Sequence, residues 1–303
     1  MLPTATWSWD RLLGRIRGAL PDLPSVLGAT RLHGGMIHHV FELTLSGGPG
    51  RAVLKVSEQP GDPFGREFRE LDLLWSRRLL PCPRPWAVAP GGHEGPAFLL
   101  MERLPGSHWG AAPMSRREHR DVEVRLAELL LRLHGEFAEG FARYGEPPRQ
   151  SWLDVFVPML EENLRLAEPS LPAAWVAVAD RAIAEMPRLW SLGQPARPRL
   201  VHGDVWSGNV LVDRGPEGWT VTGLVDPALH YADEEYEIAY LECFHTVGEQ
   251  FLSAYRAAMP EREGYRARRL FYWLNTMLIH VRLFGDEEYL LRTGRILAAL
   301  ERL

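Results

Sequence analysis

The chain has 303 residues, of which 46% are hydrophobic and 24% are charged. These proportions are typical of a folded protein and exclude a disordered chain. The formal net charge of -5 provides no general positive field for a phosphate backbone, so we expect no nucleic-acid partner. No apolar run approaches the ~18 residues that a membrane span needs, and no signal sequence is evident at the N-terminus, so we expect a cytoplasmic protein without membrane contact.

The first hundred residues predict a small antiparallel sheet with one helix. Glycine-rich residues at 47–50 are typical of a hairpin turn. The helix is expected to begin near Asp62, where the carboxylate can cap it, and to end before Pro81. The expected strands are 38–45, 51–57, 86–89 and 97–102.

After Pro105 the pattern becomes mainly helical. Ser115 and Glu118 have the spacing of a capping box, and apolar residues then recur at helical spacing. A strand and a hairpin are expected within 199–226. The further expected helices are 151–167, 172–190, 233–258, 264–284 and 286–302. The sequence therefore predicts an α+β fold with a β-rich lobe followed by a larger, mainly helical lobe.

Residues 202–209 contain the pattern His-x-Asp-x-x-x-x-Asn, which is typical of phosphoryl-transfer sites. In such a site the aspartate, here Asp204, accepts the proton of an attacking hydroxyl group, while the asparagine, here Asn209, binds a metal ion. Asp226 follows an apolar strand and is expected to bind the same ion. Oxygen ligands of this kind suit Mg²⁺, which takes further ligands from phosphate. The alternative is an ordinary loop with an aspartate-capped turn.

Lys55 is the only lysine among the 34 Lys and Arg residues of the chain. Alternation along its strand places it on the face opposite its apolar neighbours, where it can point into a cleft. Kinases use a lysine in this position to contact the α- and β-phosphates of ATP, and a glutamate of the next helix holds it. We expect Glu67 rather than Glu70 to be that glutamate, because Glu67 lies on the packing face. A solvent-exposed glutamate is the alternative.

Two further segments fit a nucleotide site. Gly34 and Gly35 precede the first hairpin strand, where glycine amides can approach phosphates closely, although a plain turn is the alternative. The last strand of the sheet leads into the lobe boundary, which in a two-lobed kinase is the hinge that binds adenine. Met101 would then guard the pocket, and the Glu102 carbonyl and the Leu104 amide would contact adenine. An edge strand followed by a linker is the alternative.

Together these motifs resemble the fructosamine kinase (ketosamine 3-kinase) family, a branch of the aminoglycoside and choline phosphotransferase group. The segments that carry the resemblance are HGDVWSGNVLVD at 202–213, DPALHYADEEYEIA at 226–239 and HVRLFG at 280–285. The resemblance extends over nearly all of residues 8–302. It implies a two-lobed protein-kinase-like fold, with an ATP-binding lobe at 1–104 and a catalytic and substrate-binding lobe at 105–303.

The resemblance also implies the activity: phosphorylation of the 3-hydroxyl group of a ketosamine, with ATP and Mg²⁺. A ketosamine is a sugar joined to an amine by glycation, and the substrate would be a small molecule or a glycated protein. Trp206 is then expected to face the sugar, Asp233 and Glu235 to attract its amine, and His280 to belong to the substrate site. The alternatives are a core tryptophan and a pair of carboxylates that cap or orient their helix. A monomer and a homodimer both stay open.

The chain departs from the family pattern at four positions. Glu237 stands where aspartate is usual, Ile279 and Arg282 where asparagine is common, and His38 where the glycine loop often has asparagine. These departures leave the loop geometry and the substrate pocket open. Competing interpretations are a kinase for an aminoglycoside or amino alcohol, and a nucleotide-binding pseudokinase that acts as an interaction module.

Overall fold

The computed structural model describes residues 2–3, 6–32, 38–192 and 195–303. The chain divides into two compact units, each with its own hydrophobic cluster. The first unit consists of Met1–Met114 and Ser207–Ala228, and the second consists of Ser115–Trp206 and Leu229–Leu303.

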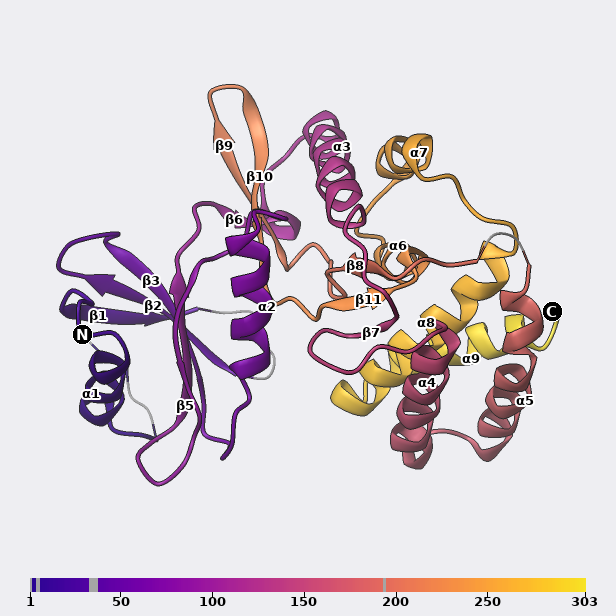
Figure 1. The fold of residues 1–303 in the computed structure, drawn as a ribbon, viewed down its shortest axis with the longest axis horizontal. Helices are drawn as coiled ribbons and strands as arrows, with labels where there is room; N and C mark the ends of the chain where they lie inside the picture. Colours follow the sequence, from indigo (N-terminus) through magenta and orange to yellow (C-terminus); the bar gives the residue numbers. More distant parts are fainter. Residues whose placement is uncertain (1, 4–5, 33–37, 193–194) are drawn as a thin grey trace. The chain divides into compact units, whose positions relative to one another are not determined.

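The first unit contains an antiparallel sheet with the strand order β1-β2-β3-β5-β4 (Figure 1). Its strands are β1 (Val26–Arg31), β2 (His39–Leu45), β3 (Arg51–Ser57), β4 (Pro85–Ala89) and β5 (Ala97–Glu102). Four of them, β2, β3, β4 and β5, match the predicted strands. The sequence analysis did not predict β1, which pairs antiparallel with β2.

Two helices of the first unit, α1 (Trp9–Ala19) and α2 (Gly65–Ser76), pack on opposite faces of this sheet (Figure 1). Leu12 and Ile16 of α1 join the cluster formed by the apolar face of the strands. The sequence analysis did not predict α1. The available signals were the i, i+4 spacing of these two residues and Ser8, whose hydroxyl group caps the helix.

The hairpin β9 (Val210–Gly215) and β10 (Gly218–Leu224) also belongs to the first unit, where β9 pairs with β6 (Ser107–His108). The backbones of Gly106 and Val212 lie close together, and a Cβ atom at position 106 would lie 2.1 Å from the carbonyl oxygen of Val212. The φ of Gly106 is +91°, which other residues rarely adopt. The hairpin thus packs with the first unit, although it follows the predicted boundary at 104/105 in the sequence. The predicted division into an ATP-binding lobe at 1–104 and a substrate-binding lobe at 105–303 stays a prediction.

The second unit is mainly helical. Its helices are α3 (Arg116–Leu133), α4 (Leu153–Ala167), α5 (Ala173–Trp190), α6 (Glu234–Cys243), α7 (Glu249–Ala258), α8 (Tyr265–Phe284) and α9 (Glu287–Leu300). A small sheet has the order β7-β11-β8, with β7 (Ala142–Arg143), β11 (His230–Ala232) and β8 (Arg199–Val201). The predicted capping box of α3 is confirmed, because Ser115 and Glu118 bond reciprocally. The single helix predicted at 233–258 is wrong, because the chain turns at His245, whose φ is +51°.

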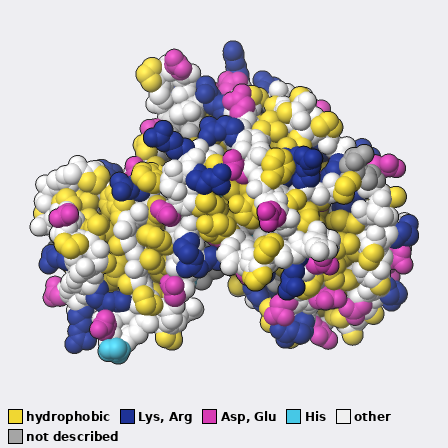
Figure 2. Space-filling model, in the orientation of Figure 1, with side chains coloured by type: hydrophobic (Ala, Val, Ile, Leu, Met, Phe, Trp, Pro, Cys, Tyr) yellow, Lys and Arg dark blue, Asp and Glu magenta, His cyan; other side chains and the backbone are white. Residues whose placement is uncertain are grey.

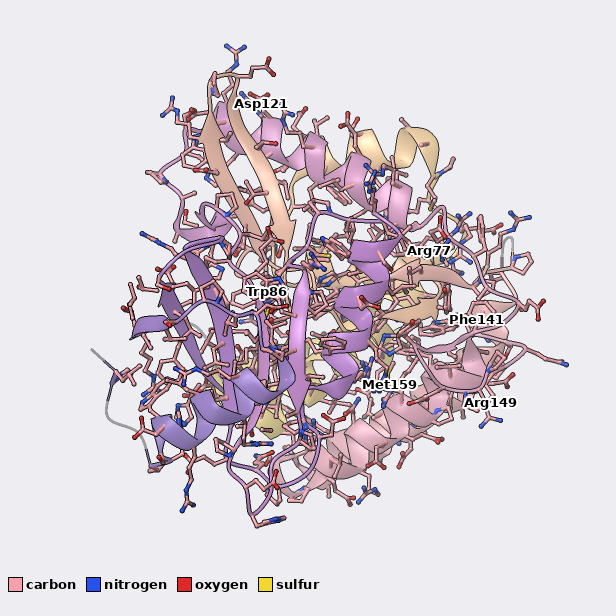
Figure 3. All side chains as sticks on the ribbon, turned by 60° about the vertical axis from the view of Figure 1, so that its left-hand side comes forward. Arg77, Trp86, Asp121, Phe141, Arg149 and Met159 are labelled. Atoms are coloured by element: carbon pink, nitrogen blue, oxygen red, sulfur yellow. The ribbon has the colours of Figure 1, made fainter. Side chains whose placement is uncertain are left out.

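An aromatic cluster forms the core of the second unit. The ring of Phe156 on α4 stacks on Trp152 at 5.6 Å and meets Tyr272 of α8 at 4.9 Å between centroids. Phe141 and Met159, both labelled in Figure 3, belong to the same cluster. Offset and edge-to-face contacts of this kind stabilise a core beyond simple area burial.

Replacing Phe156 with Ala is expected to lower the free energy of unfolding by about 3–5 kcal/mol, because a fully buried ring leaves a cavity that its neighbours fill only in part. Denaturant titration followed by circular dichroism measures the change. Leu291→Ala is the matched control, since Leu291 is exposed. Equal losses in the two variants would contradict the central role of Phe156.

The surface is mixed in charge on the face drawn in Figure 2, where Lys and Arg side chains are interspersed with Asp and Glu side chains. The mixture agrees with a net charge of -5 composed of many charges of both signs. Within the described part of the chain, no helix is both long and apolar enough to cross a membrane.

Candidate active site

Lys55 forms a buried ion pair on the α2 side of the first unit's sheet. Its Nζ donates to Oε1 of Glu67 at 2.7 Å, and only 8% of Lys55 is exposed. Glu70, the other candidate partner, binds Arg66 instead, at 2.7 Å. The neighbours Leu54 and Val56 point to the other face, into the cluster that α1 completes. Alternation along β3 thus explains why Lys55 faces α2.

Asp226 is the second partner of Lys55, and its Oδ1 accepts a short hydrogen bond from Nζ. The φ of Asp226 is +56°, in the left-handed region, so the chain turns sharply just after β10. The side chain is 45% exposed. The amide of the preceding residue, Val225, donates to the carbonyl of Asn209 at 3.0 Å. The fold therefore places the backbone of Asn209 beside the residue that precedes Asp226.

The charges of this group are coupled. Burial by itself would lower the pKa of Lys55, but Asp226 and Glu67 raise it above its usual value, so the ammonium group stays charged. Burial raises the pKa of Glu67 to about 7, although Lys55 opposes the shift. The pair is thus held by charge in a site where an isolated carboxylate would tend to bind a proton.

Asp226 and Asn209, the predicted metal ligands, both carry oxygen atoms of the kind that Mg²⁺ binds. Asp226 offers a partly exposed carboxylate, and Asn209 offers an amide. Among residues 2–3, 6–32, 38–192 and 195–303, no group of three or more His, Cys, Asp or Glu side chains is arranged to hold a metal ion. Mg²⁺ commonly binds through one or two protein ligands, together with water and substrate phosphates.

The structure describes only some of the residues predicted to contact the nucleotide. Gly34 and Gly35 lie outside the described residues. Met101 is buried on β5, and the Glu102 amide donates to the Arg84 carbonyl at 2.9 Å. Leu104 is buried against Gly223, where a Cβ atom would lie 2.2 Å from its Cδ1. Packing within the first unit thus positions Met101, Glu102 and Leu104, and their roles as hinge residues and in adenine contact stay predictions.

His38, which precedes β2, lies close enough to Lys55 and Asp226 to interact with their charges. Its ring makes an edge-to-face contact with Phe64, with centroids 4.8 Å apart. Burial lowers the pKa of His38, and the charge of Lys55 lowers it further. The imidazole is therefore biased toward its neutral form.

The loop that carries Asp204 follows β8 in the second unit and is held by Glu237 of α6. Oε2 of Glu237 accepts from the His202 amide at 3.2 Å, and Oε1 accepts from the Gly203 amide at 2.6 Å. Nε2 of the buried His134 lies 2.8 Å from the same carboxylate, and its Nδ1 lies 2.6 Å from the hydroxyl of Tyr255. Burial would raise the pKa of Glu237, but the bond to His134 lowers it below its usual value.

Tyr240 adds a contact that the sequence analysis missed. Its hydroxyl group donates a short hydrogen bond to Oδ1 of Asp204. Tyr240 lies three residues after Glu237, so both side chains leave the same face of α6. That spacing was the available signal, but nothing in the sequence indicates that α6 packs against this loop.

Asp233 and Glu235 both bind partners within the second unit. Asp233 caps α6 by accepting from the Glu235 amide at 3.0 Å, and it forms an ion pair with Arg262. Arg268 donates to both carboxylate oxygens of Glu235, at 2.7 and 2.9 Å. Both carboxylates are buried. Burial and pairing therefore favour the capping and orienting interpretation, and the contact of these two residues with a substrate amine stays a prediction.

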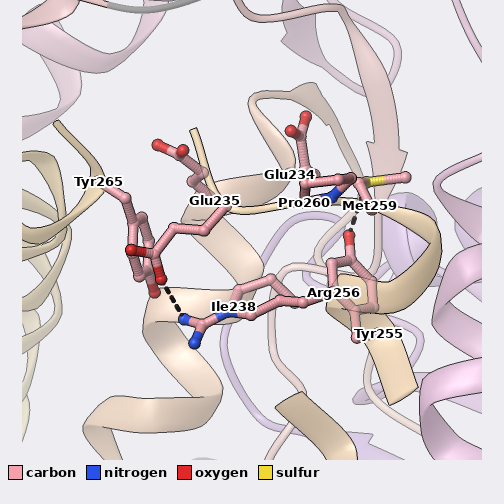
Figure 4. Close-up of a pocket in the computed structure, with 9 residues that line it drawn as sticks. Glu234, Glu235, Ile238, Tyr255, Arg256, Met259, Pro260 and Tyr265 are labelled. Atoms are coloured by element: carbon pink, nitrogen blue, oxygen red, sulfur yellow. Dashed lines mark hydrogen bonds and ion pairs between the residues drawn. The ribbon is translucent and has the colours of Figure 1, made fainter. Parts of the chain in front are cut away.

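A small pocket beside the N-terminus of α6 has the same ionic character (Figure 4). Glu234 and Glu235 line it together with Arg256, which forms an ion pair with Glu261 at 2.6 Å. Arg199 lies 3.3 Å from a carboxylate oxygen of Glu234. The carboxylates of this pocket thus already have cationic partners within the protein.

The two remaining substrate candidates, Trp206 and His280, are both half-buried in the second unit. Nδ1 of His280 lies 2.8 Å from the carbonyl of Thr276, one turn earlier on α8, and therefore carries the proton. Burial lowers the pKa of His280. Its ring lies 5.0 Å from that of Phe244 and 4.9 Å from that of Tyr289, between centroids. A neutral imidazole among aromatic rings favours packing, and the contact of either residue with substrate stays a prediction.

The chain is similar in sequence to kinases of fructosamines and other ketosamines. A family model described as fructosamine kinase matches residues 22–302. A protein assigned as a ketoamine kinase in Enterococcus faecium is 34% identical over 201 residues, which cover 63% of this chain and 67% of that protein. Ketosamine-3-kinase of Mus musculus is 27% identical over 275 residues, which cover 78% of this chain and 84% of that protein.

A solved structure shares the fold of this chain. A crystal structure from Thermobifida fusca, assigned as a fructosamine-3-kinase, superposes with a TM-score of 0.77 at 23% identity and covers 98% of this chain and 100% of that one. The predicted α+β, protein-kinase-like fold class, with a small antiparallel sheet and a larger helical part, is thereby confirmed.

Proposed function

Because the chain belongs to the fructosamine kinase family, we propose that it transfers the γ-phosphoryl group of ATP to the 3-hydroxyl group of a ketosamine. It is a phosphotransferase with a hydroxyl group as acceptor. The observation that carries the proposal is the buried Lys55, bound to Glu67 and Asp226, in a chain whose family consists of kinases. The acceptor is a small ketosamine or a glycated protein.

The nucleotide is assigned to residues of the first unit. The ammonium group of Lys55 contacts the α- and β-phosphates, and Glu67 keeps that group in place. We assign Gly34 and Gly35, which lie outside the described residues, to the phosphates, and Met101, Glu102 and Leu104 to adenine.

Asn209 and Asp226 would hold Mg²⁺, and Lys55 binds one of these two residues, Asp226. When bound, the ion neutralises charge on the phosphate oxygens. The hydrogen bond between Lys55 and Asp226 supports this assignment, because the proposed metal ligand and the proposed phosphate-binding ammonium group are in contact.

The acceptor hydroxyl is assigned to Asp204. As the 3-oxygen forms its bond to the γ-phosphorus and the bond to the β,γ-bridging oxygen breaks, the carboxylate of Asp204 takes the hydroxyl proton and ADP leaves. Glu237 supports this role by fixing the backbone on the N-terminal side of Asp204 through two amides. Trp206 is assigned to the sugar face, where an aromatic plane packs on C–H groups.

A panel of acceptors tests the proposal. Fructose, ribulose and erythrulose adducts of lysine, and a glycated protein, are each incubated with Mg·ATP, and ADP release is measured. NMR of the product locates the phosphate. We expect turnover with at least one ketosamine and phosphate on its 3-oxygen. Kanamycin and choline are the control acceptors. Turnover with either control and with no ketosamine would replace the proposal with the aminoglycoside or amino alcohol interpretation.

A further inference from the structure

Helix α6 binds both the backbone and the Asp204 side chain of the loop after β8. Glu237 accepts from the backbone amides of His202 and Gly203, at 3.2 and 2.6 Å, and so holds the chain. Tyr240 donates to Oδ1 of the Asp204 side chain and so holds the carboxylate itself. One face of one helix therefore determines both where the loop lies and how its carboxylate is turned.

The phenol is the donor in this hydrogen bond. Burial raises the pKa of Tyr240 well above its usual value, and the negative charge of Asp204 raises it further. The proton therefore stays on the phenol oxygen while Asp204 is ionised. Other titratable groups around the pair include Tyr236, Glu237 and Cys243 of α6, and His202, whose Nδ1 accepts from the Asp204 amide at 3.3 Å.

We propose that Tyr240 is a positioning residue that fixes the rotation of the Asp204 carboxylate, so that Oδ1 is held by the phenol and Oδ2 receives the proton of the acceptor hydroxyl. The inference rests on the proposed function, in which Asp204 is the base. A carboxylate on a loop otherwise rotates about its terminal bonds, and each rotation away from the productive angle removes the acceptor from reach. The hydrogen bond also stabilises the charged form, which keeps Asp204 able to accept a proton at lower pH.

Tyr240→Phe isolates the hydroxyl group. The ring of Tyr240 packs edge to face with that of Phe244 at 5.0 Å between centroids, and phenylalanine preserves this contact. Tyr144→Phe is the matched control, because it removes a phenol hydroxyl from a half-buried tyrosine of the same unit. Thermal unfolding of both variants shows whether the fold is intact.

Two measurements follow on each protein. The first is the dependence of kcat/KM on pH for an accepted ketosamine, together with KM for ATP. For Tyr240→Phe we expect kcat/KM to fall on the order of 10-fold at neutral pH, and its acidic limb to move up by about one pH unit, because one hydrogen bond to a charged group is lost. KM for ATP and the Tyr144→Phe profile are expected to match the wild type.

The second measurement needs no substrate. The side-chain carboxyl carbons are labelled with ¹³C at aspartate, the Asp204 signal is assigned by its absence in Asp204→Asn, and its titration is followed by NMR. We expect the titration midpoint to rise in Tyr240→Phe and not in Tyr144→Phe. An unchanged midpoint, or an unchanged acidic limb with only lower stability, would overturn the inference and leave Tyr240 as a packing residue.

The two measurements separate this inference from the proposed function. If the wild type phosphorylates no ketosamine but the Asp204 midpoint shifts in Tyr240→Phe, the proposed substrate is wrong and the control of Asp204 by Tyr240 stands. If ketosamines are phosphorylated and the midpoint does not move, the proposed function stands and the inference fails.

Discussion

Asp204→Asn is expected to lower kcat by about 10²- to 10⁴-fold, which is the usual contribution of a general base. Asparagine has nearly the same shape and retains an oxygen that can accept from the hydroxyl of Tyr240, so the loop should keep its conformation. It has no charge with which to take the acceptor proton. The affinity for Mg·ATP, measured by calorimetric titration, is expected to stay close to that of the wild type.

Asp213→Asn is the control for this variant. It removes the same charge from an exposed aspartate on β9. Its kcat should equal that of the wild type. Unchanged turnover in Asp204→Asn would remove Asp204 from the mechanism. A parallel loss of Mg·ATP affinity would indicate that Asp204 acts on the nucleotide rather than on the acceptor.

Lys55→Arg is expected to reduce turnover on the order of 100-fold although the positive charge is kept. Nζ of Lys55 lies between two carboxylates in a buried position, at 2.7 Å from Glu67 and in a short contact with Asp226. The planar guanidinium group is wider and cannot occupy the same point. A misplacement of about 1 Å at a reacting phosphate can cost on the order of 100-fold in rate. Steady-state kinetics with varied ATP measures the effect.

The matched control is Arg51→Lys on the same strand. Arg51 is exposed and forms an ion pair with Glu42 at 3.1 Å, so exchanging the two cation types there should change neither kcat nor KM for ATP. Thermal unfolding with and without Mg·ATP tests whether Lys55→Arg folds and still binds nucleotide. Near-native kcat and KM in Lys55→Arg would show that charge alone is enough and would move the nucleotide site elsewhere.

Local sequence patterns predicted much of the secondary structure. The hairpin of β2 and β3, the capping box of α3 and the side of β3 on which Lys55 lies all follow from relations between residues a few positions apart. The sequence also selected Asp204, Asn209 and Asp226 as candidates by type and spacing, and their roles stay predictions. The break between α6 and α7 was not predicted, because it depends on the left-handed conformation of His245, a residue that is also acceptable within a helix.

Relations between distant residues were decided by the tertiary structure. The sequence around Asp233 and Glu235 does not show whether these carboxylates face a substrate or arginines. The packing of α8 and of the segment before it brings Arg262 and Arg268 to them. In the same way, the contact of Tyr240 with Asp204 joins residues 36 positions apart.

What the sequence by itself determined is which side chains are candidates for phosphoryl transfer and on which face of a strand or helix a residue lies. The first depends on residue type, and the second depends on a repeat of two or 3.6 residues. What only the tertiary structure decided is which charged groups share a buried site. Burial makes an isolated charge costly, so each carboxylate must find its cation or donor wherever the packed chain provides one. Lys55 with Glu67, Glu235 with Arg268 and Asp204 with Tyr240 are the pairings that result.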